Sequence, residues 1–210
     1  MKLYTLENDY LFKNIFRNEL YLKKLLLDFF DVKCETIEYL NTELIRSNKN
    51  DKIGIVDLLL NIDNNIVILE LQNIDRHNFK ERLLFYSSSI IANHCLKVSE
   101  DYRNLRMIKL YAIINYNLLD NSVKNRVRLK SKNKIFTKKL EYQIFNLARV
   151  DINNKNNSYY EMANLFKTND LNKLTRIIEN NLNMEILNKI KYYNLDSKEY
   201  KKMEDIERLM

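Results

Sequence analysis

The sequence contains no proline, one glycine, two cysteines and two histidines in 210 residues. Cys34 and Cys95 stand alone, and His77 and His94 do not have the spacing of zinc ligands. We therefore expect neither a disulfide framework nor a structural zinc site. An AT-rich genome, whose codons favour Asn, Lys, Ile and Tyr over Gly and Pro, is the simplest cause of this bias. The number of lysines or asparagines alone therefore carries little weight.

Long apolar runs are absent as well. The longest, residues 53–62, is too short to span a bilayer, and it contains Asp57. Residues 1–9 lack the apolar core of a signal peptide. We therefore expect a cytoplasmic protein that does not contact a membrane. Hydrophobic residues at 46% and charged residues at 30% are ordinary for a globular protein and exclude a disordered one.

The formal net charge of +7 suits a polyanionic partner such as DNA. Charge of this kind affects solubility and the steering of a ligand, but it does not identify a reaction. The oligomeric state stays open, with a homodimer among the alternatives.

Hydrophobic periodicity predicts an α/β fold with a mixed central sheet and a helical C-terminal region. Residues 1–150 form the expected main domain, and residues 151–210 form the helical extension. Helices are expected over residues 8–31 and 76–97, and strands over residues 36–40, 54–62, 66–72, 107–116, 123–135 and 141–147. The strands at 54–62 and 66–72 are apolar on both faces, so we expect helices to cover both sides of the sheet.

Two acidic side chains interrupt the apolar hairpin strands: Asp57 in the first and Glu70 in the second. If the turn between the strands consists of two residues, Ile62 faces Asn65. In an antiparallel pair, the numbers of two facing residues always add up to the same total. Asp57 and Glu70 have the same total as Ile62 and Asn65, so they should face each other. Their β-carbons would then lie roughly 4.5–5.5 Å apart. Gln72 then lies on the same face as Glu70.

Two carboxylates that face each other in an apolar sheet repel, unless one is protonated or a cation lies between them. Mg²⁺ or Mn²⁺ is the cofactor that this pair predicts, because hard cations are bound by one or two carboxylates together with phosphate oxygens. Such a cation polarises a phosphodiester for hydrolysis. The alternative is that Asp57 or Glu70 points outward at a strand end, or pairs with Arg82 or Lys52.

The order of these elements, with Asp57 ahead of the Glu70-x-Gln72 motif, resembles the core of the PD-(D/E)XK nuclease superfamily. More narrowly, it resembles the PD-(D/E)XK nuclease family transposases, also called recombination-promoting nucleases. The matching stretches are residues 8–16, 55–57, 68–72 and 79–86. The resemblance implies a restriction-endonuclease-like fold: a helix, a mixed central sheet with the Asp/Glu-x-Gln hairpin, and a flanking helix. It also implies that Asp57 and Glu70 bind the metal with the backbone carbonyl of Leu71.

Gln72 stands where the superfamily motif usually has a lysine. A glutamine amide orients a water molecule but has no charge to stabilise an attacking hydroxide. Lys52, Lys80 and Arg82 are the candidates to supply that charge. Arg82 and Tyr86, one helical turn apart, resemble a family pair that contacts phosphate or supports the acids. The alternative for this pair is a packed helix with a snorkelling arginine and a core tyrosine.

Two further features have a functional and a structural interpretation. Asp9 either faces the site from the first helix or compensates the helix dipole. The alternating cations of residues 123–135 either bind DNA phosphates along one strand face or protect an exposed sheet edge from aggregation. These cations are Lys124, Arg126, Arg128, Lys130, Lys132 and Lys134.

The function that these observations predict is metal-dependent endonucleolytic cleavage of DNA, and the resemblance implies a role in recombination or the movement of mobile elements. Because Gln72 replaces the motif lysine, a catalytically inactive relative that binds DNA or a protein is the main alternative. An RNA-directed nuclease is a third, since phosphate chemistry does not distinguish the sugars.

Overall fold

The computed structural model describes residues 2–44, 54–94 and 100–209. The chain divides into two compact units: Met1–Lys33 with Arg149–Met210, and Cys34–Ala148. This division differs from the expected domains, because the N-terminal helices cluster with the C-terminal ones. The expected division into residues 1–150 and 151–210 stays a prediction.

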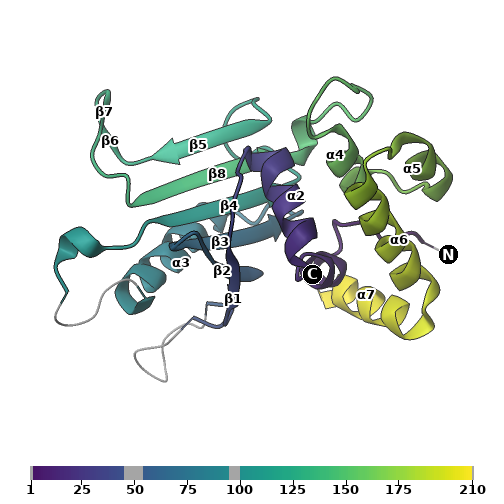
Figure 1. The fold of residues 1–210 in the computed structure, drawn as a ribbon, viewed down its shortest axis with the longest axis horizontal. Helices are drawn as coiled ribbons and strands as arrows, with labels where there is room; N and C mark the ends of the chain where they lie inside the picture. The colour runs from purple at the N-terminus through teal and green to yellow at the C-terminus, as the bar shows by residue number, and fades with distance from the viewer. Residues whose placement is uncertain (1, 45–53, 95–99, 210) are drawn as a thin grey trace. The chain divides into compact units, whose positions relative to one another are not determined.

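In the described residues, six strands of the second unit form one mixed sheet in the order β1-β2-β3-β4-β8-β5 (Figure 1). The pairs β1–β2, β2–β3 and β5–β8 are antiparallel, and β3–β4 and β4–β8 are parallel. The strands are β1 (Ile37–Leu40), β2 (Leu58–Ile62), β3 (Asn65–Gln72), β4 (Ile108–Ile114), β5 (Lys124–Arg128) and β8 (Leu140–Asn146). The prediction of an α/β fold with a mixed central sheet is confirmed.

Helix α3 (Phe79–His94) lies between β3 and β4 in the chain and covers one face of the sheet. A parallel pair needs such a crossover. Phe79, Leu83 and Ile90 of α3 join a buried cluster with the even-numbered residues of the strands. These residues are Ile66, Ile68, Ile108, Leu110, Ala112, Ile114, Leu140 and Ile144. Odd-numbered residues of the same strands, such as Leu69 and Ile113, are also buried, in keeping with their two-sided apolar pattern.

The single strand expected over residues 123–135 is wrong. The strand β5 ends at Arg128, and β6 (Lys130–Ser131) and β7 (Lys134–Ile135) form a separate two-stranded hairpin. Lys132, in the turn of this hairpin, has a φ of 52°. In a chain with one glycine, a turn made by lysine and asparagine lacks the usual sequence marker. The alternating cations of residues 123–135 therefore looked like one strand, although the chain reverses direction at Lys132.

The described residues of the first unit form helices. They are α1 (Asp9–Ile15), α2 (Glu19–Phe30), α4 (Tyr160–Lys167), α5 (Leu171–Ile177), α6 (Asn181–Leu195) and α7 (Ser197–Leu209). Short 3₁₀ helices occur at Tyr102–Asn104 in the second unit and at Leu147–Arg149. The one helix expected over residues 8–31 is two, because Asn18 caps α2. Its side-chain oxygen accepts hydrogen bonds from the backbone of Leu20 and Tyr21 at 3.0 and 3.3 Å.

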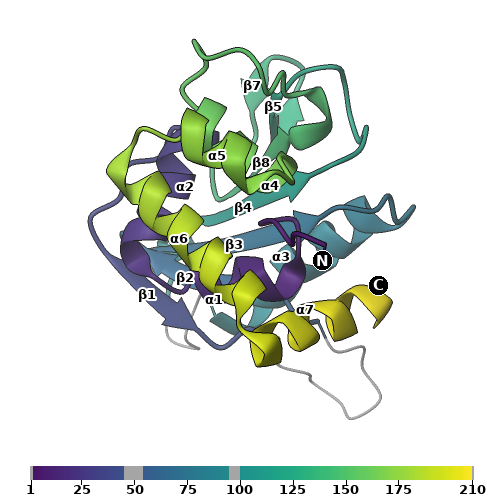
Figure 2. The ribbon, with the colours of Figure 1, turned by 90° about the vertical axis from the view of Figure 1, so that its right-hand side faces the viewer.

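Aromatic rings fill the centre of the first unit. The ring of Phe166 in α4 lies 5.4 Å from that of Phe29 in α2 and 6.4 Å from that of Phe16. Figure 2 shows α1 beside α6 and α7 in this unit.

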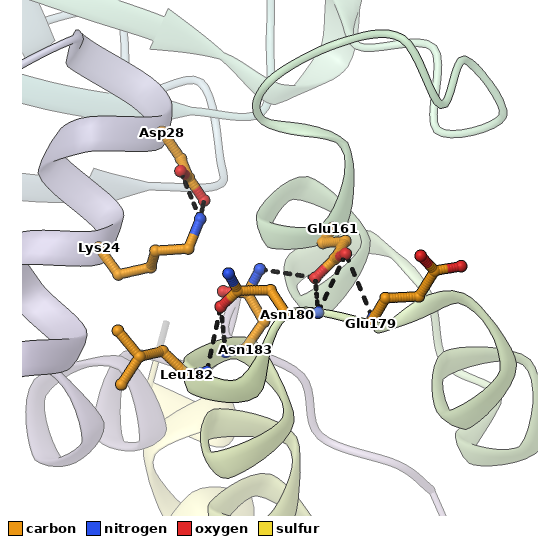
Figure 3. A network of polar contacts seen from close by, with 7 residues as sticks. All are labelled: Lys24, Asp28, Glu161, Glu179, Asn180, Leu182 and Asn183. Atoms are coloured by element: carbon orange, nitrogen blue, oxygen red, sulfur yellow. Dashed lines mark hydrogen bonds and ion pairs between the residues drawn. The ribbon is translucent and has the colours of Figure 1, made fainter.

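A polar network fixes the start of α6 (Figure 3). The carboxylate of Glu161 accepts hydrogen bonds from the backbone of Glu179 and Asn180 and from the side chain of Asn183. Nearby, Lys24 and Asp28 form an ion pair at 2.6 Å. The charges of Lys24, Asp28 and Glu161 each have a partner, so a structural role accounts for these three residues.

Among the helices of the described residues, none is long and apolar enough to cross a membrane.

Candidate active site

The hairpin of β2 and β3 has the two-residue turn that the pairing argument requires. Asp63 and Asn64 have φ values of 46° and 63°, the left-handed conformation that this kind of turn needs at both positions. The carboxylate of Asp63 also accepts hydrogen bonds from the backbone of Thr36 and Glu35, at 2.9 and 3.1 Å. These bonds tie the turn to the segment that leads into β1.

The register of the hairpin is the expected one. Ile62 pairs with Asn65 next to the turn, and the pairing continues without a bulge to the start of β2. Asp57 directly precedes β2, so the same register carries it to the position opposite Glu70. The strand expected over residues 54–62 is shorter than predicted, so Asp57 lies one residue before the paired part of β2.

Each acid is held by the main chain of the opposite segment. The backbone N–H of Asp57 donates a hydrogen bond to Oε1 of Glu70 at 2.9 Å. In return, the backbone N–H of Leu71 donates to Oδ2 of Asp57 at 2.8 Å. Glu70 is buried, whereas Asp57 is partly exposed. Each carboxylate is therefore fixed against the main chain of the other acid's segment, and Asp57 is the more accessible of the two.

Gln72 and Arg82 complete the polar group beside the acids. Gln72 and Glu70 both lie on the face of the sheet that α3 covers. The Nη2 of Arg82 in α3 donates a hydrogen bond to the side-chain oxygen of Gln72. The Gln72 amide nitrogen donates to the carbonyl of Ile74 at 2.7 Å. The same Nη2 lies 3.9 Å from Oε2 of Glu70, and the guanidinium stands 5.0 Å from the centre of the Phe79 ring. These contacts fix the orientation of the Gln72 amide and bring a permanent positive charge to the acids.

Tyr86 packs against the segment that leads into Asp57. A β-carbon built on Gly54, the only glycine, would lie 3.1 Å from the Tyr86 ring and 2.8 Å from Cδ1 of Leu44. Gly54 is thus needed for a close approach of the backbone to α3. That Tyr86 supports the acid hairpin stays a prediction, and its ring lies close to the segment that leads into Asp57.

The remaining candidates for a role beside the acids are Asp9, Lys80 and Lys52. Asp9 is at the start of α1 in the first unit and forms an ion pair with Lys13 at 2.7 Å, so its role near the acids stays a prediction. Lys80 is exposed on α3. Lys52 lies outside the described residues. Among the candidate cations that the structure describes, Arg82 contacts Gln72 and Glu70.

The residues present fit a divalent cation in part. Two carboxylates from neighbouring segments on one sheet face are the oxygen ligands that Mg²⁺ takes from a protein, with substrate oxygens and waters completing its shell. Within residues 2–44, 54–94 and 100–209, no group of three or more His, Cys, Asp or Glu side chains could hold a metal ion. A cation at Asp57 and Glu70 would therefore depend on other oxygens as well. The carbonyl of Leu71 stays the predicted protein contribution.

The basic residues of β5 lie on the other face of the sheet. Along the paired strands, Glu70 aligns with Ala112, then with Ile144 and finally with Asn125. Since neighbouring residues of a strand point to opposite faces, Lys124, Arg126 and Arg128 face away from the side that carries Glu70. The six cations therefore do not form one face of one strand, although their contact with DNA stays a prediction.

Glu141 in β8 is a residue that the sequence argument missed. Its carboxylate pairs with Arg126 at 2.8 Å and with Nε of Arg128, and it accepts a hydrogen bond from Gln143 at 2.8 Å. Two of the six cations thus neutralise a buried acid. The signal was present, because Glu141 is the one acid within an otherwise uncharged strand that follows the basic segment.

Tyr116, which follows β4, was also missed, because it looked like the end of a buried strand. Its ring lies 6.3 Å from Phe79, next to Arg82. Burial raises the pKa of its phenol and nearby Asp75 raises it further, while Arg82 opposes the shift. Tyr116 therefore adds a neutral hydroxyl to the group of side chains around Arg82.

A family model described as PD-(D/E)XK nuclease family transposase matches residues 6–209, which is nearly the whole chain. Comparison with curated proteins and with solved structures gives no significant match. The match extends beyond residues 8–117, where the sequence resemblance is clearest, and includes the helices of the C-terminal segment.

Proposed function

The chain belongs to the PD-(D/E)XK nuclease family transposases, and we propose that it is a metal-dependent endonuclease that hydrolyses DNA phosphodiesters in recombination or the movement of mobile elements. The mixed sheet with its acid hairpin and flanking helix is consistent with a restriction-endonuclease-like fold. The observation that supports the proposal is the reciprocal main-chain hydrogen bonding of Asp57 and Glu70, next to the contact between Gln72 and Arg82.

Asp57 and Glu70 would hold the cation, and the Leu71 carbonyl would assist them. When bound, a divalent cation supplies positive charge that polarises the phosphodiester. The main-chain hydrogen bonds to both carboxylates set their positions before any ligand arrives. Such preorganisation lowers the cost of reaching the reactive geometry.

Together, Gln72 and Arg82 perform the two roles that the motif lysine usually has, which are orienting the water and supplying positive charge. The Gln72 amide orients the attacking water, and the Arg82 guanidinium stabilises the negative charge that develops on the phosphate. Their direct contact supports this division, since the guanidinium donates a hydrogen bond to the amide oxygen of the residue at the motif-lysine position.

One observation favours the alternative, a catalytically inactive DNA- or protein-binding relative. Arg82 lies 3.9 Å from Glu70 and partly neutralises it without any metal. If that pairing were the sole purpose of Arg82, the acids would be structural, as in the alternative weighed from the sequence.

Incubation of supercoiled plasmid with Mg²⁺ or Mn²⁺, with and without chelator, tests the proposal. We expect nicking that requires the metal and is lost in Asp57→Ala and in Glu70→Ala. Glu35→Ala, an exposed acid of the same unit, is the matched control and should retain activity. Full activity in both acid variants would contradict the assignment. A folded wild-type protein that cleaves nothing would favour the inactive relative, and preferential cleavage of RNA would favour the RNA-directed enzyme.

The expected partner is DNA, the expected location is the cytoplasm, and the homodimer stays one alternative for the oligomeric state. Analytical ultracentrifugation of the chelated protein over a range of concentrations separates monomer from dimer.

A further inference from the structure

The β6–β7 hairpin extends from the end of β5 away from the six-stranded sheet (Figure 1). Every residue from Leu129 to Phe136 is exposed. The backbone N–H of Phe136 donates to the carbonyl of Leu129 at 3.0 Å, which continues the pairing of β6 with β7 toward the base of the hairpin. Residues 129–136 therefore form a short, ordered arm.

The arm is basic. Lys130, Lys132 and Lys134 are exposed, Lys138 follows them, and residues 129–138 contain no acid. No ion pair to these four lysines is found in the part of the chain that the structure describes. The arginines of β5 differ, because Arg126 and Arg128 bind Glu141. The unneutralised positive charge of the basic segment is thus concentrated on the arm.

The arm also exposes apolar side chains. Phe136 is 80% exposed, Leu129 is 49% exposed and Ile135 is 37% exposed. Because Leu129 and Phe136 are cross-strand partners, their side chains lie together on one face of the hairpin. Ser131 and Lys134 form the next pair on that face, while Lys130 and Ile135 are paired on the other. Apolar and basic side chains are therefore mixed on both faces.

This mixture distinguishes two classes of anionic partner. An element that lies on a membrane surface needs an apolar face separated from its charged face, and the arm has no such separation. Proteins that bind single-stranded nucleic acid instead combine cations for the backbone with an aromatic ring on which a base stacks. In an intact duplex, the neighbouring base pairs cover both faces of each base. An exposed phenyl ring therefore stacks most favourably on a base that is unpaired.

We propose that residues 129–138 form a DNA-binding arm that takes single-stranded or unstacked DNA, with its lysines on the phosphates and Phe136 on a base. This inference rests on the proposed function, because it supplies the substrate class of the same enzyme. The proposed DNA-binding surface contains the lysines of the arm in place of all six cations expected along one strand. It also contains Phe136, which the charge pattern did not indicate.

Titration of the full chain, with chelator present to prevent cleavage, against a labelled oligonucleotide and its duplex tests the arm. Phe136→Ala should weaken single-strand binding by about 10-fold, the effect of losing one stacking partner, with little change for duplex. Phe136→Tyr should retain the affinity. Tyr102→Ala removes an aromatic side chain that is 88% exposed elsewhere in the unit, and it should change nothing.

The combined change of Lys130, Lys132 and Lys134 to Gln tests the phosphate contacts. It should flatten the slope of log affinity against log salt by about 2, since each contact to a single strand contributes about 0.7. A matched control with the same loss of charge changes Lys155, Lys173 and Lys189, which are exposed in the first unit, to Gln. The control should keep the wild-type slope.

Several outcomes would overturn the inference. One is single-strand affinity that is unchanged in Phe136→Ala, and another is an equal loss of salt slope in both lysine variants. A third is binding of the wild type to phosphatidylglycerol vesicles but not to DNA. A fourth is a dimer that Phe136→Ala converts to monomer while DNA affinity stays constant, which assigns the arm to self-association. If the arm variants bind normally while wild-type plasmid nicking still requires Asp57, the arm fails and the proposed function stands.

Discussion

Two buried glutamates of the same sheet contact arginines, yet their surroundings differ. Glu141 binds Arg126 and Arg128 directly and accepts a further hydrogen bond from Gln143. Glu70 accepts a main-chain hydrogen bond from Asp57, and its arginine, Arg82, stands 3.9 Å away with its Nη2 directed at Gln72. The two glutamates are on opposite faces of the sheet.

The difference fits a structural role for Glu141 and the proposed catalytic role for Glu70. Burial raises the pKa of Glu141, but hydrogen bonds from Gln143, Arg126 and Arg128 outweigh it and leave the pKa below its usual value. Two cations thus satisfy one carboxylate. At the hairpin, Glu70 lies 3.9 Å from a single arginine, and both Glu70 and Asp57 accept main-chain hydrogen bonds.

The largest effect should come from removing the arginine of the acid hairpin. Arg82→Gln should lower plasmid nicking by about 100- to 1000-fold, the cost of losing one group that stabilises transition-state charge. Arg126→Gln, at the other glutamate, should leave the rate within about twofold if its role is structural. Single-turnover cleavage at saturating metal measures both, and equal losses would erase the distinction between the two sites.

A charge exchange tests whether Gln72 and Arg82 share the role of one lysine. Gln72→Lys alone places an ammonium group against the Arg82 guanidinium, and we expect about a 10-fold loss of nicking from this repulsion. Combining Gln72→Lys with Arg82→Gln should recover about 10-fold relative to Arg82→Gln alone, because the cation returns to the motif position. A double variant no better than Arg82→Gln would argue against a shared role.

For stability we expect the opposite order, with a larger loss from the arginine at Glu141 than from the arginine at Glu70. Arg128→Gln leaves the buried Glu141 carboxylate with a weaker partner and should lower the free energy of unfolding by about 1–3 kcal/mol. Arg82→Gln should cost about 1 kcal/mol or less, since its contact with Glu70 is long and partly exposed. Urea unfolding followed by circular dichroism measures both. A larger loss in Arg82→Gln would show that Arg82 is the structural arginine.

The smallest effect should be a pH dependence at Glu141. Because its pKa is lowered in the folded protein, its ionised form stabilises the fold above the unfolded pKa of about 4.3, and this contribution is lost as pH falls through the lower folded value. Glu141→Gln should therefore be less stable than wild type by about 1 kcal/mol at neutral pH, and the difference should shrink below pH about 4. A difference that grows in acid would contradict the lowered pKa.

Local patterns predicted the acid hairpin well. The run of Asp63 and Asn64 between apolar strands determined the turn, and turn length determined the register that places Asp57 opposite Glu70. Helix α3 followed from its 3.6-residue periodicity. These elements depend on contacts between residues close in sequence, and the family resemblance pointed to the same residues.

Predictions that depended on distant pairing were weaker. The turn at Lys132 had no glycine to mark it, so one strand was expected where β5 and a hairpin occur. Strand order decides that Arg126 and Glu70 lie on opposite faces, and no local pattern contains that order. Similarly, the sequence left three cations as candidates beside Gln72, and the contact of Arg82 with Gln72 depends on the packing of α3 on the sheet.

The parallel pairing of β3 with β4 has a consequence for the order in which the site assembles during folding. Asp57 and Glu70 are 13 residues apart and meet when a hairpin closes, an event of about 1–10 μs. Arg82 in α3 also follows closely in the chain, so its contacts with Gln72 and Glu70 join residues near in sequence. The sheet on which α3 packs is complete only when β4 and then β8 have joined it, and such non-local steps are slower. The polar group of the hairpin and α3 would then be assembled before the sheet that holds it in place is finished.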